Sequence, residues 1–473
     1  MDRREFIGKS LKGVGGAVCA ATRLSALPGG KDSRLKHSFR RPKQNGWTFV
    51  HLEGTPAEVG FQHGYWLAAE IDDGLKVIQL EQTHDSKRDW QFFRHKAKDM
   101  MWRRIEPEYR EELAGIAAGL QARGLTADLW DIVALNGAME WDYYLKRHEK
   151  VRSKSASASL AVAEHCSAFV ATGSYTKDGK PVIAHNCWTD YLDGERWTVI
   201  SDLAPAHGHR ILMDTYPGFI HSGDDFGVND AGIAITETTI THFSGYDPEG
   251  IPEFVRARKA MQYAASIDDF ARMMKDGNNG GYANNWLVAD CKTNEVADLE
   301  LGLKNVRLWR TTSGYLVGSN FPVNPKLAEQ ETDFNLEDMG ESANARHVRW
   351  KQLMAQHKGA IDLALAQAFL ADHYDTCDKK TSANERTLCG HIDLSPRGSR
   401  PWQPPYGPAG AVQNKAADAS MLEKMSFTAS AGHCCGMDFK AAEHVRQHPE
   451  FSWQEPELRD MDAYPWTPFK IET

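Results

Sequence analysis

The sequence predicts an α+β protein in which helices flank a layered core of strands. Three observations support this class: a largely helical stretch from residue 47 to about 150, a group of short apolar runs after it, and a return of helical patterns beyond residue 250. A short strand is expected at residues 48–52, ahead of the first helices. Hydrophobic residues make up 41% of the 473 residues, which is enough for one large core.

The first helical stretch is recognised by its apolar spacing. Between residues 107 and 122, Leu113, Ile116 and Leu120 recur at steps of three and four residues, which is typical of an amphipathic helix. Thr126 precedes the next apolar run and is expected to cap its first turn.

The second stretch alternates short apolar runs with turn residues, and we expect these runs to be strands flanked by helices. The expected strands are 168–172, 182–185, 197–203, 210–214, 233–239, 286–289 and 296–300, and the expected helices are 252–265, 267–275, 345–356 and 361–371. Residues 393–412 read as an irregular loop, and residues 451–469 as a tail that wraps the core.

Composition excludes two classes of function. The formal net charge is −9 and no stripe of Lys or Arg opposes it, so we expect no nucleic-acid partner. No apolar run approaches the roughly 20 residues of a membrane-spanning helix, so we expect no membrane span.

Residues 1–30 are expected to form an export signal. Arg3 and Arg4 precede Phe6 and a short stretch of small, mildly apolar residues, a pattern that resembles a twin-arginine signal. Cys19 would offer a lipoprotein anchor as a weaker alternative, because Val18 before it is large for that motif. The chain is therefore expected to be exported, to the periplasm or to the outside of the cell.

The eight cysteines suit an exported protein. Removal of Cys19 with the signal leaves an odd number, so at least one thiol should stay unpaired. Cys377 and Cys389 flank a polar loop and are expected to form a local disulfide. The adjacent Cys434 and Cys435 need separate partners or stay reduced.

Cys166 is the principal catalytic candidate. It follows a Ser/Ala-rich run at residues 154–159, expected to be an exposed linker, and it begins a hairpin with an apolar first strand. A thiol at this position suits an N-terminal nucleophile hydrolase, which cuts its own chain before the nucleophile and uses the freed α-amino group as base. The alternative is a buried or disulfide-bonded structural cysteine.

Polar residues on the return strand are expected near Cys166. With Asp178-Gly179 as the turn, residue 166 would face about residue 191, so His185, Asn186 and Asp190 lie on the same half of the hairpin. The alternative for Asn186 and Asp190 is a role in closing the loop.

Two further segments carry polar groups at strand ends. The strand at 233–239 ends on Thr238-Thr239, and Asn284-Asn285 opens the strand that contains Trp286. An Asn amide there can point its NH₂ at a developing oxyanion, a contribution of about 3–4 kcal/mol where such donors have been removed. The alternative for these Asn residues is a simple turn role.

Taken in order, these motifs resemble the phospholipase B-like family, within a wider group of N-terminal nucleophile hydrolases that includes penicillin acyltransferase-like and bile salt hydrolase-like enzymes. The resemblance runs from about residue 47 to the C-terminus. Its motifs are the entry segment 54–64, His165-Cys166-Ser167-Ala168, residues 185–191, residues 216–226, Asn284-Asn285-Trp286 and residues 342–349.

The resemblance implies a four-layer αββα sandwich and self-cleavage between His165 and Cys166. A mostly helical fragment, residues 47–165, would stay associated with the catalytic core, residues 166–473. Cys166 matches the nucleophile, Asn285 an oxyanion-hole amide, and Arg346 an arginine near the active site of the bile salt hydrolase-like members.

Three positions depart from the bile salt hydrolase pattern. His185 and Trp188 stand where those enzymes carry an arginine and an aspartate, and they look instead like the phospholipase B-like pattern. Thr239 falls where the bile salt hydrolases place a second active-site Asn, so its role is open. His185 and Arg346 are expected to orient polar parts of the substrate.

The expected reaction is hydrolysis of an ester or amide of a small-molecule or lipid-type acyl substrate through a Cys166 thioester. It requires no metal or organic cofactor, and the 19 His residues show no HExxH pattern typical of a zinc enzyme. Two alternatives stay open: an amidase or acyltransferase acting on N-acyl amino compounds or peptides, and a non-catalytic secreted binding protein with Cys166 in a disulfide.

Overall fold

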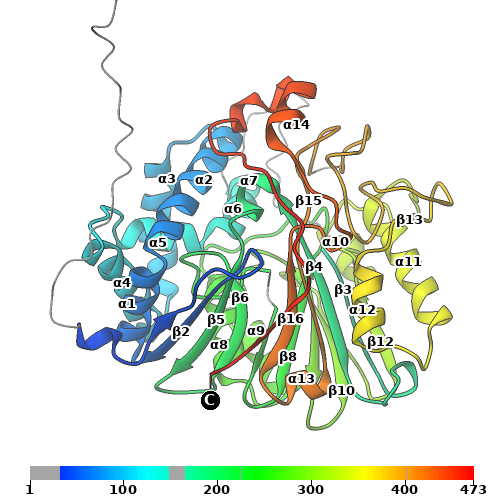
Figure 1. The fold of residues 1–473 in the computed structure, drawn as a ribbon, viewed down its shortest axis with the longest axis horizontal. Coiled ribbons are helices and arrows are strands. Elements are labelled where there is room, and N and C mark those ends of the chain that lie inside the picture. Colours follow the sequence, from blue (N-terminus) through cyan, green and yellow to red (C-terminus); the bar gives the residue numbers. More distant parts are fainter. Residues whose placement is uncertain (1–31, 149–165, 225, 401, 473) are drawn as a thin grey trace, which may run out of the picture.

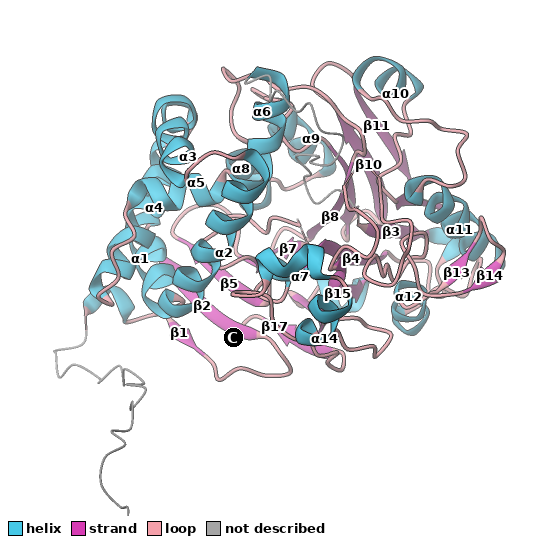
Figure 2. Ribbon diagram, turned by 90° about the horizontal axis from the view of Figure 1, so that it is seen from above, coloured by secondary structure: helices cyan, strands magenta, loops and turns pink. Residues whose placement is uncertain are grey.

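A computed structural model describes residues 32–148, 166–224, 226–400 and 402–472. Two β-sheets lie face to face at the centre of the molecule, with helices on both outer sides (Figure 1). The view from above shows the helices of the N-terminal half on one side and those near residue 350 on the other (Figure 2). The expected four-layer αββα arrangement is therefore confirmed.

The larger sheet has nine strands in the order β1-β2-β5-β6-β7-β8-β9-β10-β11. Strand β2 pairs parallel to β5, and the other neighbours are antiparallel. The strands are β1 Phe39–Arg40, β2 Thr48–Gly54, β5 Val199–Pro205, β6 Ile211–Thr215, β7 Gly227–Asn229, β8 Ile233–Thr239, β9 Asn284–Asp290, β10 Glu295–Leu301 and β11 Val306–Thr311.

The smaller sheet has six antiparallel strands in the order β12-β3-β4-β15-β16-β17. They are β3 Ser167–Thr172, β4 Val182–Asp190, β12 Gly314–Gly318, β15 Ala409–Asp418, β16 Ser426–Ala431 and β17 Thr467–Lys470. A separate two-stranded hairpin consists of β13 Tyr374–Asp375 and β14 Lys380–Thr381.

Most helices precede β3 or follow β8 and β12 in the chain. They are α1 Pro56–Trp66, α2 Ala68–Ser86, α3 Trp90–Lys96, α4 Pro107–Ala122, α5 Leu129–Asn136, α6 Trp141–His148, α7 Tyr191–Gly194, α8 Glu253–Tyr263, α9 Ile267–Lys275, α10 Pro325–Glu331, α11 Ser342–Gln356, α12 Leu363–Leu370, α13 Ala419–Leu422 and α14 Ala441–Gln447. None of the helices in the described ranges is both long enough and apolar enough to cross a bilayer.

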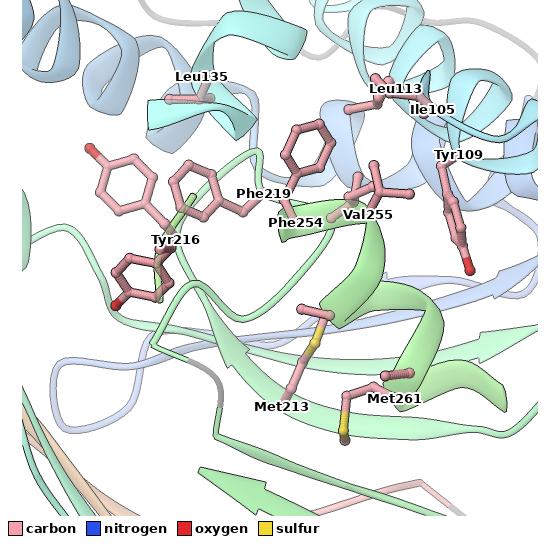
Figure 3. Close-up of a cluster of buried hydrophobic side chains, with 14 of the residues drawn as sticks. Ile105, Tyr109, Leu113, Leu135, Met213, Tyr216, Phe219, Phe254, Val255 and Met261 are labelled. Atoms are coloured by element: carbon pink, nitrogen blue, oxygen red, sulfur yellow. The ribbon is translucent and has the colours of Figure 1, made fainter. Parts of the chain in front are cut away.

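Three apolar clusters hold the layers together. One lies between the sheets and joins residues of the larger sheet such as Leu212 and Leu287 to Val170 and Ile183 of the smaller sheet. A second packs the N-terminal helices and α8 on the outer face of the larger sheet, as Figure 3 shows for the side chains around Phe254. The third packs α11 and α12 on the smaller sheet.

Most sequence-based elements are confirmed within a few residues, and β8 and α9 have the expected bounds. Three expectations were wrong. Asp128, and not Thr126, caps the first turn of α5. The region 393–412, read as a loop, includes the first residues of β15, and the tail 451–469 includes the start of β17. Both strands belong to the smaller sheet, so the C-terminal part of the chain forms half of that sheet.

The expected fragment 47–165 contributes more than helices. Strand β2 lies inside the nine-stranded sheet, where it pairs with β5 over seven residues. The expected export signal at 1–30 and the expected linker at 154–159 lie outside the described residues.

Candidate active site around Cys166

Cys166 lies at the top of β3, between the two neighbours of that strand. Strand β12 pairs with β3 on one side and β4 on the other, so the backbone that follows Cys166 is held on both edges. The side chain is only 2% exposed. In β3, Ala168 and Val170 pack between the sheets, and strand alternation turns Cys166 toward the same face.

The register of the β3–β4 hairpin differs from the expected one. Ser167 pairs with Asn186 and Ala168 with His185, so the position opposite Cys166 is Cys187 rather than residue 191. The cause is a longer connection between the two strands. The residues Gly173–Tyr175 form a 3₁₀ turn, whereas a simple Asp178-Gly179 turn would have left them in the first strand. The structure thus brings a second thiol beside the first.

Asn320 and Arg346 fix the main chain on both sides of the Cys166 Cα. The N–H of Cys166 donates to Asn320 Oδ1 at 3.0 Å, and Arg346 donates to the carbonyl oxygen of Cys166. Arg346 also donates to Asn320 Oδ1 at 2.8 Å, and to Ser167 Oγ at 3.2 Å. The Asn320 amide in turn donates to the carbonyl of Thr239 at 2.7 Å, which ties β8 to the site.

Arg346 is fully buried on α11, with its guanidinium 4.5 Å from the ring centre of Trp188. Burial lowers the pKa of Arg346 to about 9, and the charge of Cys166 opposes this shift. The expected proximity of Arg346 to Cys166 is present, and its contact is with the carbonyl oxygen of Cys166.

The surroundings of the Cys166 thiol favour the thiolate. Burial raises the pKa of Cys166, but a hydrogen bond from Cys187 and the charge of His185 outweigh burial, so the pKa is lowered well below its usual value. Burial and the neighbouring Cys166 raise the pKa of Cys187. In this pair Cys187 is therefore the hydrogen-bond donor and Cys166 the thiol that ionises more readily.

Glu237, on β8, completes what we call the Cys166 cluster: Cys166, His185, Cys187 and Glu237. The Cys166 sulfur, a His185 ring nitrogen and a Glu237 carboxylate oxygen all lie within 4.8 Å of one another. Tyr282 donates to the Glu237 carboxylate at 2.9 Å. These three groups could hold a cation, but a thiolate beside an imidazole is equally a nucleophile beside a proton acceptor.

A buried charged network lies behind His185. His185 Nδ1 is 3.8 Å from Asp224, and Asp224 and Asp214 both contact the ammonium of Lys415, which is fully buried on β15. Gln413 donates to Asp214 at 2.8 Å and to Asp224 at 2.7 Å. These contacts join the two sheets through polar groups where the apolar inter-sheet cluster ends.

The two carboxyl groups of this network differ in protonation. Burial acts against ionisation of Asp224, but Lys415 and His185 outweigh it and hold the Asp224 pKa below its usual value. Burial and the charge of Asp224 raise the pKa of Asp214 well above its usual range. Asp224 is therefore the anion that faces His185 and Lys415, while Asp214 keeps its proton.

Asn285 and Thr239 are not arranged as expected. The Asn285 amide donates to the Asp298 carboxylate at 3.2 and 3.3 Å and also supports Glu300, so its donors are taken by β10 rather than aimed at Cys166. Thr239 reaches the site through its main-chain carbonyl, which accepts from Asn320, and not through its hydroxyl.

Sequence reasoning missed five contributors, of which Glu237 lies on the expected strand at 233–239. Asn320 follows β12 in the turn Gly318-Ser319-Asn320 and has a left-handed φ of 63°, which Asn tolerates, so this turn was a usable signal. Cys187 was hidden by the register error. Asp224 lies inside the motif at residues 216–226, but that motif assigned it no role. Lys415 gave no signal, because its partners Asp214 and Asp224 lie 201 and 191 residues away in the sequence.

A cavity of about 320 Å³ opens elsewhere, on the side of the larger sheet near β2 and α2. Its wall is charged and includes Glu70, Asp73, Glu195, Arg196 and Arg459, and it does not include Cys166. The buried thiol and this open cavity are thus separate features.

The comparisons with known proteins agree with the motifs. Residues 81–302 match the family model of phospholipase B. Phospholipase B-like 1 of Caenorhabditis elegans is 24% identical over 63% of this chain and 56% of its own length. The 40 kDa form of acyl-coenzyme A:6-aminopenicillanic-acid-acyltransferase of Emericella nidulans is 24% identical over 57% of this chain and 68% of its own.

Among solved structures, a single-residue variant of conjugated bile acid hydrolase from Clostridium perfringens aligns with 56% of this chain and 89% of its own, at 12% identity and a TM-score of 0.32. The chain spans about half the length of the first curated relatives it matches. The sequence resemblance to the phospholipase B-like family is confirmed by the family model and the curated relatives.

Proposed function

We propose that this relative of the phospholipase B-like proteins is an N-terminal nucleophile hydrolase that cuts its own chain before Cys166 and then hydrolyses acyl esters or amides. The observation that carries the proposal is the arrangement at Cys166. A buried thiol with a lowered pKa has its main-chain N–H and C=O held by Asn320 and Arg346. A structural cysteine needs neither clamp.

Self-cleavage would begin with attack of the Cys166 sulfur on the carbonyl carbon of His165. The C–S bond forms, the peptide C–N bond breaks, and the nitrogen of Cys166 takes the proton that the thiol gives up. Water then hydrolyses the thioester, restores the thiol and leaves a carboxylate on His165. Asn320 Oδ1, already 3.0 Å from this nitrogen, would then accept from the new α-amino group.

In turnover the α-amino group is the base. Its unperturbed pKa of about 7.7–8.0 suits transfer of a proton at neutral pH. The Cys166 sulfur attacks the acyl carbon, the alcohol or amine leaves with a proton, and water releases the acid from the thioester. His185, whose Nδ1 lies 3.8 Å from Asp224, favours the thiolate because it lowers the pKa of Cys166.

Asn285 is the oxyanion donor in this scheme only if its amide leaves Asp298. Burial raises the pKa of Asp298 well above its usual value, so this carboxyl group keeps its proton. A protonated Asp298 holds that amide less firmly than an anion would. Replacement Asn285→Ala should then lower kcat by about 10²–10³-fold with little change in KM.

An amidase or acyltransferase activity is the second candidate, favoured by the similarity to the fungal acyltransferase. The experiment uses purified, self-cleaved protein with phosphatidylcholine vesicles, an N-acyl amino acid and an added amine as acyl acceptor. Release of fatty acid and lysolipid supports the lipid hydrolase. Acid from the N-acyl amino acid alone supports the amidase, and an N-acylated acceptor supports transfer.

A secreted binding protein is the alternative from another class, with Cys187 as the thiol nearest to Cys166 for a disulfide. Peptide mapping under non-reducing conditions would find a Cys166–Cys187 crosslink and no acyl-enzyme in that case. The hydrolase proposal expects instead that an acyl group from the substrate is trapped on Cys166 at acid pH.

Export is also proposed, from residues 1–30. A fusion of these residues to a reporter should move it out of the bacterial cytoplasm, and replacement of Arg3 and Arg4 by Lys should stop this movement. Unchanged movement of the doubly substituted fusion would overturn the twin-arginine proposal.

A further inference from the structure

A second group of thiols and imidazoles lies far from Cys166 in the sequence. We call it the C-terminal ligand cluster: His373, Cys389, His391 and Cys435. His373 follows α12, Cys389 and His391 lie in the loop that leads to β15, and Cys435 follows β16. One atom of each side chain, two ring nitrogens and two sulfurs, lies within 4.8 Å of the other three.

The distances between these atoms fit the edges of a tetrahedron around one ion. With metal–nitrogen bonds of about 2.0–2.1 Å and metal–sulfur bonds of about 2.3 Å, ligand atoms of a tetrahedral Zn²⁺ site lie about 3.4 Å apart for N and N and about 3.6 Å for N and S. The two Nε2 atoms of His373 and His391 are 3.2 Å apart, and His391 Nε2 is 3.5 Å from the Cys435 sulfur.

The chemistry of the cluster points in the same direction. Nε2 atoms of two imidazoles face each other, although at most one can donate a proton to the other. Cys389 is fully buried, and its side-chain hydrogen-bond partners are other thiols, Cys434 and Cys435, which are weak donors and acceptors. A cation at the centre would use all four inward-facing lone pairs.

We propose that His373, Cys389, His391 and Cys435 bind one structural Zn²⁺ ion. A set of two nitrogens and two sulfurs in tetrahedral positions selects zinc, since Ca²⁺ and Mg²⁺ prefer oxygen ligands. Binding releases the two thiol protons to solvent, and the two thiolates then balance the charge of the ion. Four protein ligands leave no position for water, so the site is structural rather than catalytic.

A supporting shell surrounds His391. Its Nδ1 atom faces the Asp393 carboxylate at 4.0 Å, and His433 stacks on its ring with centroids 4.1 Å apart. Tyr191 donates to Asp393 at 2.8 Å and lies 3.0 Å from His433 Nε2. Ligating histidines commonly direct their second nitrogen toward a carboxylate, and this shell provides one.

The cluster does not match the disulfide that the sequence suggested. Cys377 and Cys389 are both free thiols in the structure, and the thiols that approach Cys389 are those of Cys434 and Cys435. A disulfide from Cys389 to either residue would account for two sulfurs. It would leave the facing nitrogens of His373 and His391 without a common partner.

The zinc site would stabilise the loop that packs against Trp188, next to the Cys166 site. Gly390, between two ligands, lies so close to Trp188 that a Cβ on it would be 2.1 Å from the Trp188 ring. The same ring contacts Arg346, the residue that holds the Cys166 carbonyl. The ion would therefore stabilise the loop against which the active-site arginine packs.

The test is the metal content of the full chain, purified with a non-histidine tag and without chelator. We expect about one zinc per chain, and a tenfold or greater loss in Cys389→Ser, Cys435→Ser and His391→Asn. Cys377→Ser is the matched control, because that thiol is outside the cluster, and it should keep its zinc.

A second measurement uses wild-type protein only, so that it does not depend on whether the variants fold. Wild-type protein stripped with a chelator and titrated with Co²⁺ should develop the visible bands of tetrahedral thiolate coordination. Addition of Zn²⁺ to the cobalt form should abolish these bands, and addition of Zn²⁺ to the stripped protein should raise its Tm. Protein free of metal that gains neither bands nor stability, or a Cys389 crosslinked to Cys434 or Cys435 in the metal-free chain, would overturn the proposal.

Discussion

The Cys166 cluster and the C-terminal ligand cluster use the same side-chain types, and both abut strand β4. His185 and Cys187 point from β4 into the space between the sheets, toward Asp224 and Lys415. Asn186 and Trp188 point from the opposite face toward the loop of the ligand cluster, where Asn186 donates to the carbonyl of Leu388 at 2.8 Å. One strand therefore serves two different arrangements of sulfur and nitrogen.

The two clusters differ in what lies around them. Three charged groups lie next to the Cys166 cluster: the Asp224 carboxylate, the Lys415 ammonium and the Arg346 guanidinium. Around the ligand cluster the close contacts are other thiols and imidazoles, with one carboxylate at 4.0 Å. One thiolate held by charges is suited to attack carbon, and several neutral ligands that converge are suited to bind a cation.

The largest expected effect concerns the charges behind His185. Asp224→Asn should destabilise the protein by about 3–5 kcal/mol, because Lys415 and His185 lose the anion they face in a buried site. Asp214→Asn is the matched control and should cost less, since the Asp214 pKa is raised and the group already carries a proton. Urea unfolding of both variants measures the difference, and equal costs would contradict this assignment of charge.

The next effect concerns the thiolate itself. The charge of His185 lowers the pKa of Cys166, so His185→Gln raises that pKa and leaves less thiolate at a given pH. The acid limb of the pH–rate profile should move to higher pH, with the rate at neutral pH falling about tenfold for each unit of rise. His95→Gln, on the surface of α3, is the control. A lower rate with an unmoved acid limb would limit His185 to substrate orientation.

A smaller effect tests the contact between the two clusters. Gly390 has a φ of 60° and no room for a Cβ beside Trp188, whereas Gly436 has a φ of 88° and open space around it. Gly436→Ala should cost about 1–2 kcal/mol from backbone strain alone. Gly390→Ala should cost about 1–3 kcal/mol more, because the Trp188 ring must move. Equal losses in thermal unfolding would show that the two clusters are not in contact.

The sequence was sufficient for the layers and for the place of Cys166 at the start of a strand. Periodicity located many of the helices and eight of the seventeen strands of the described residues, because the apolar faces of these elements are regular, and β8 and α9 matched in full. Strand β15 was misread at its start because residues 409–412 follow directly on a stretch rich in Pro and Gly. Its later positions gave no apolar pattern, because they include Gln413 and Lys415, polar residues that pair with acids of the opposite sheet. Local patterning cannot reveal a strand whose buried face is polar.

The site was predicted in part for the same reason. Cys166, His185 and Arg346 follow from motifs, and the structure brings them together. The contribution of Asn320, the pairing of Cys187 with Cys166 and the convergence of the four side chains of the C-terminal ligand cluster depend on contacts between distant segments. The ligand cluster is the clearest case, because spacings from residue 373 to residue 435 resemble no short metal-binding motif.

The most direct test of the central claim is the intact mass of the purified chain and of Cys166→Ala. We expect wild-type protein to separate under denaturing conditions into two fragments, the second beginning at Cys166, and Cys166→Ala to stay uncut and lose activity by about 10³-fold or more. Cys291→Ala should behave as wild type. An uncut wild-type chain with full activity, or a Cys166→Ala chain cut at the same bond, would contradict it.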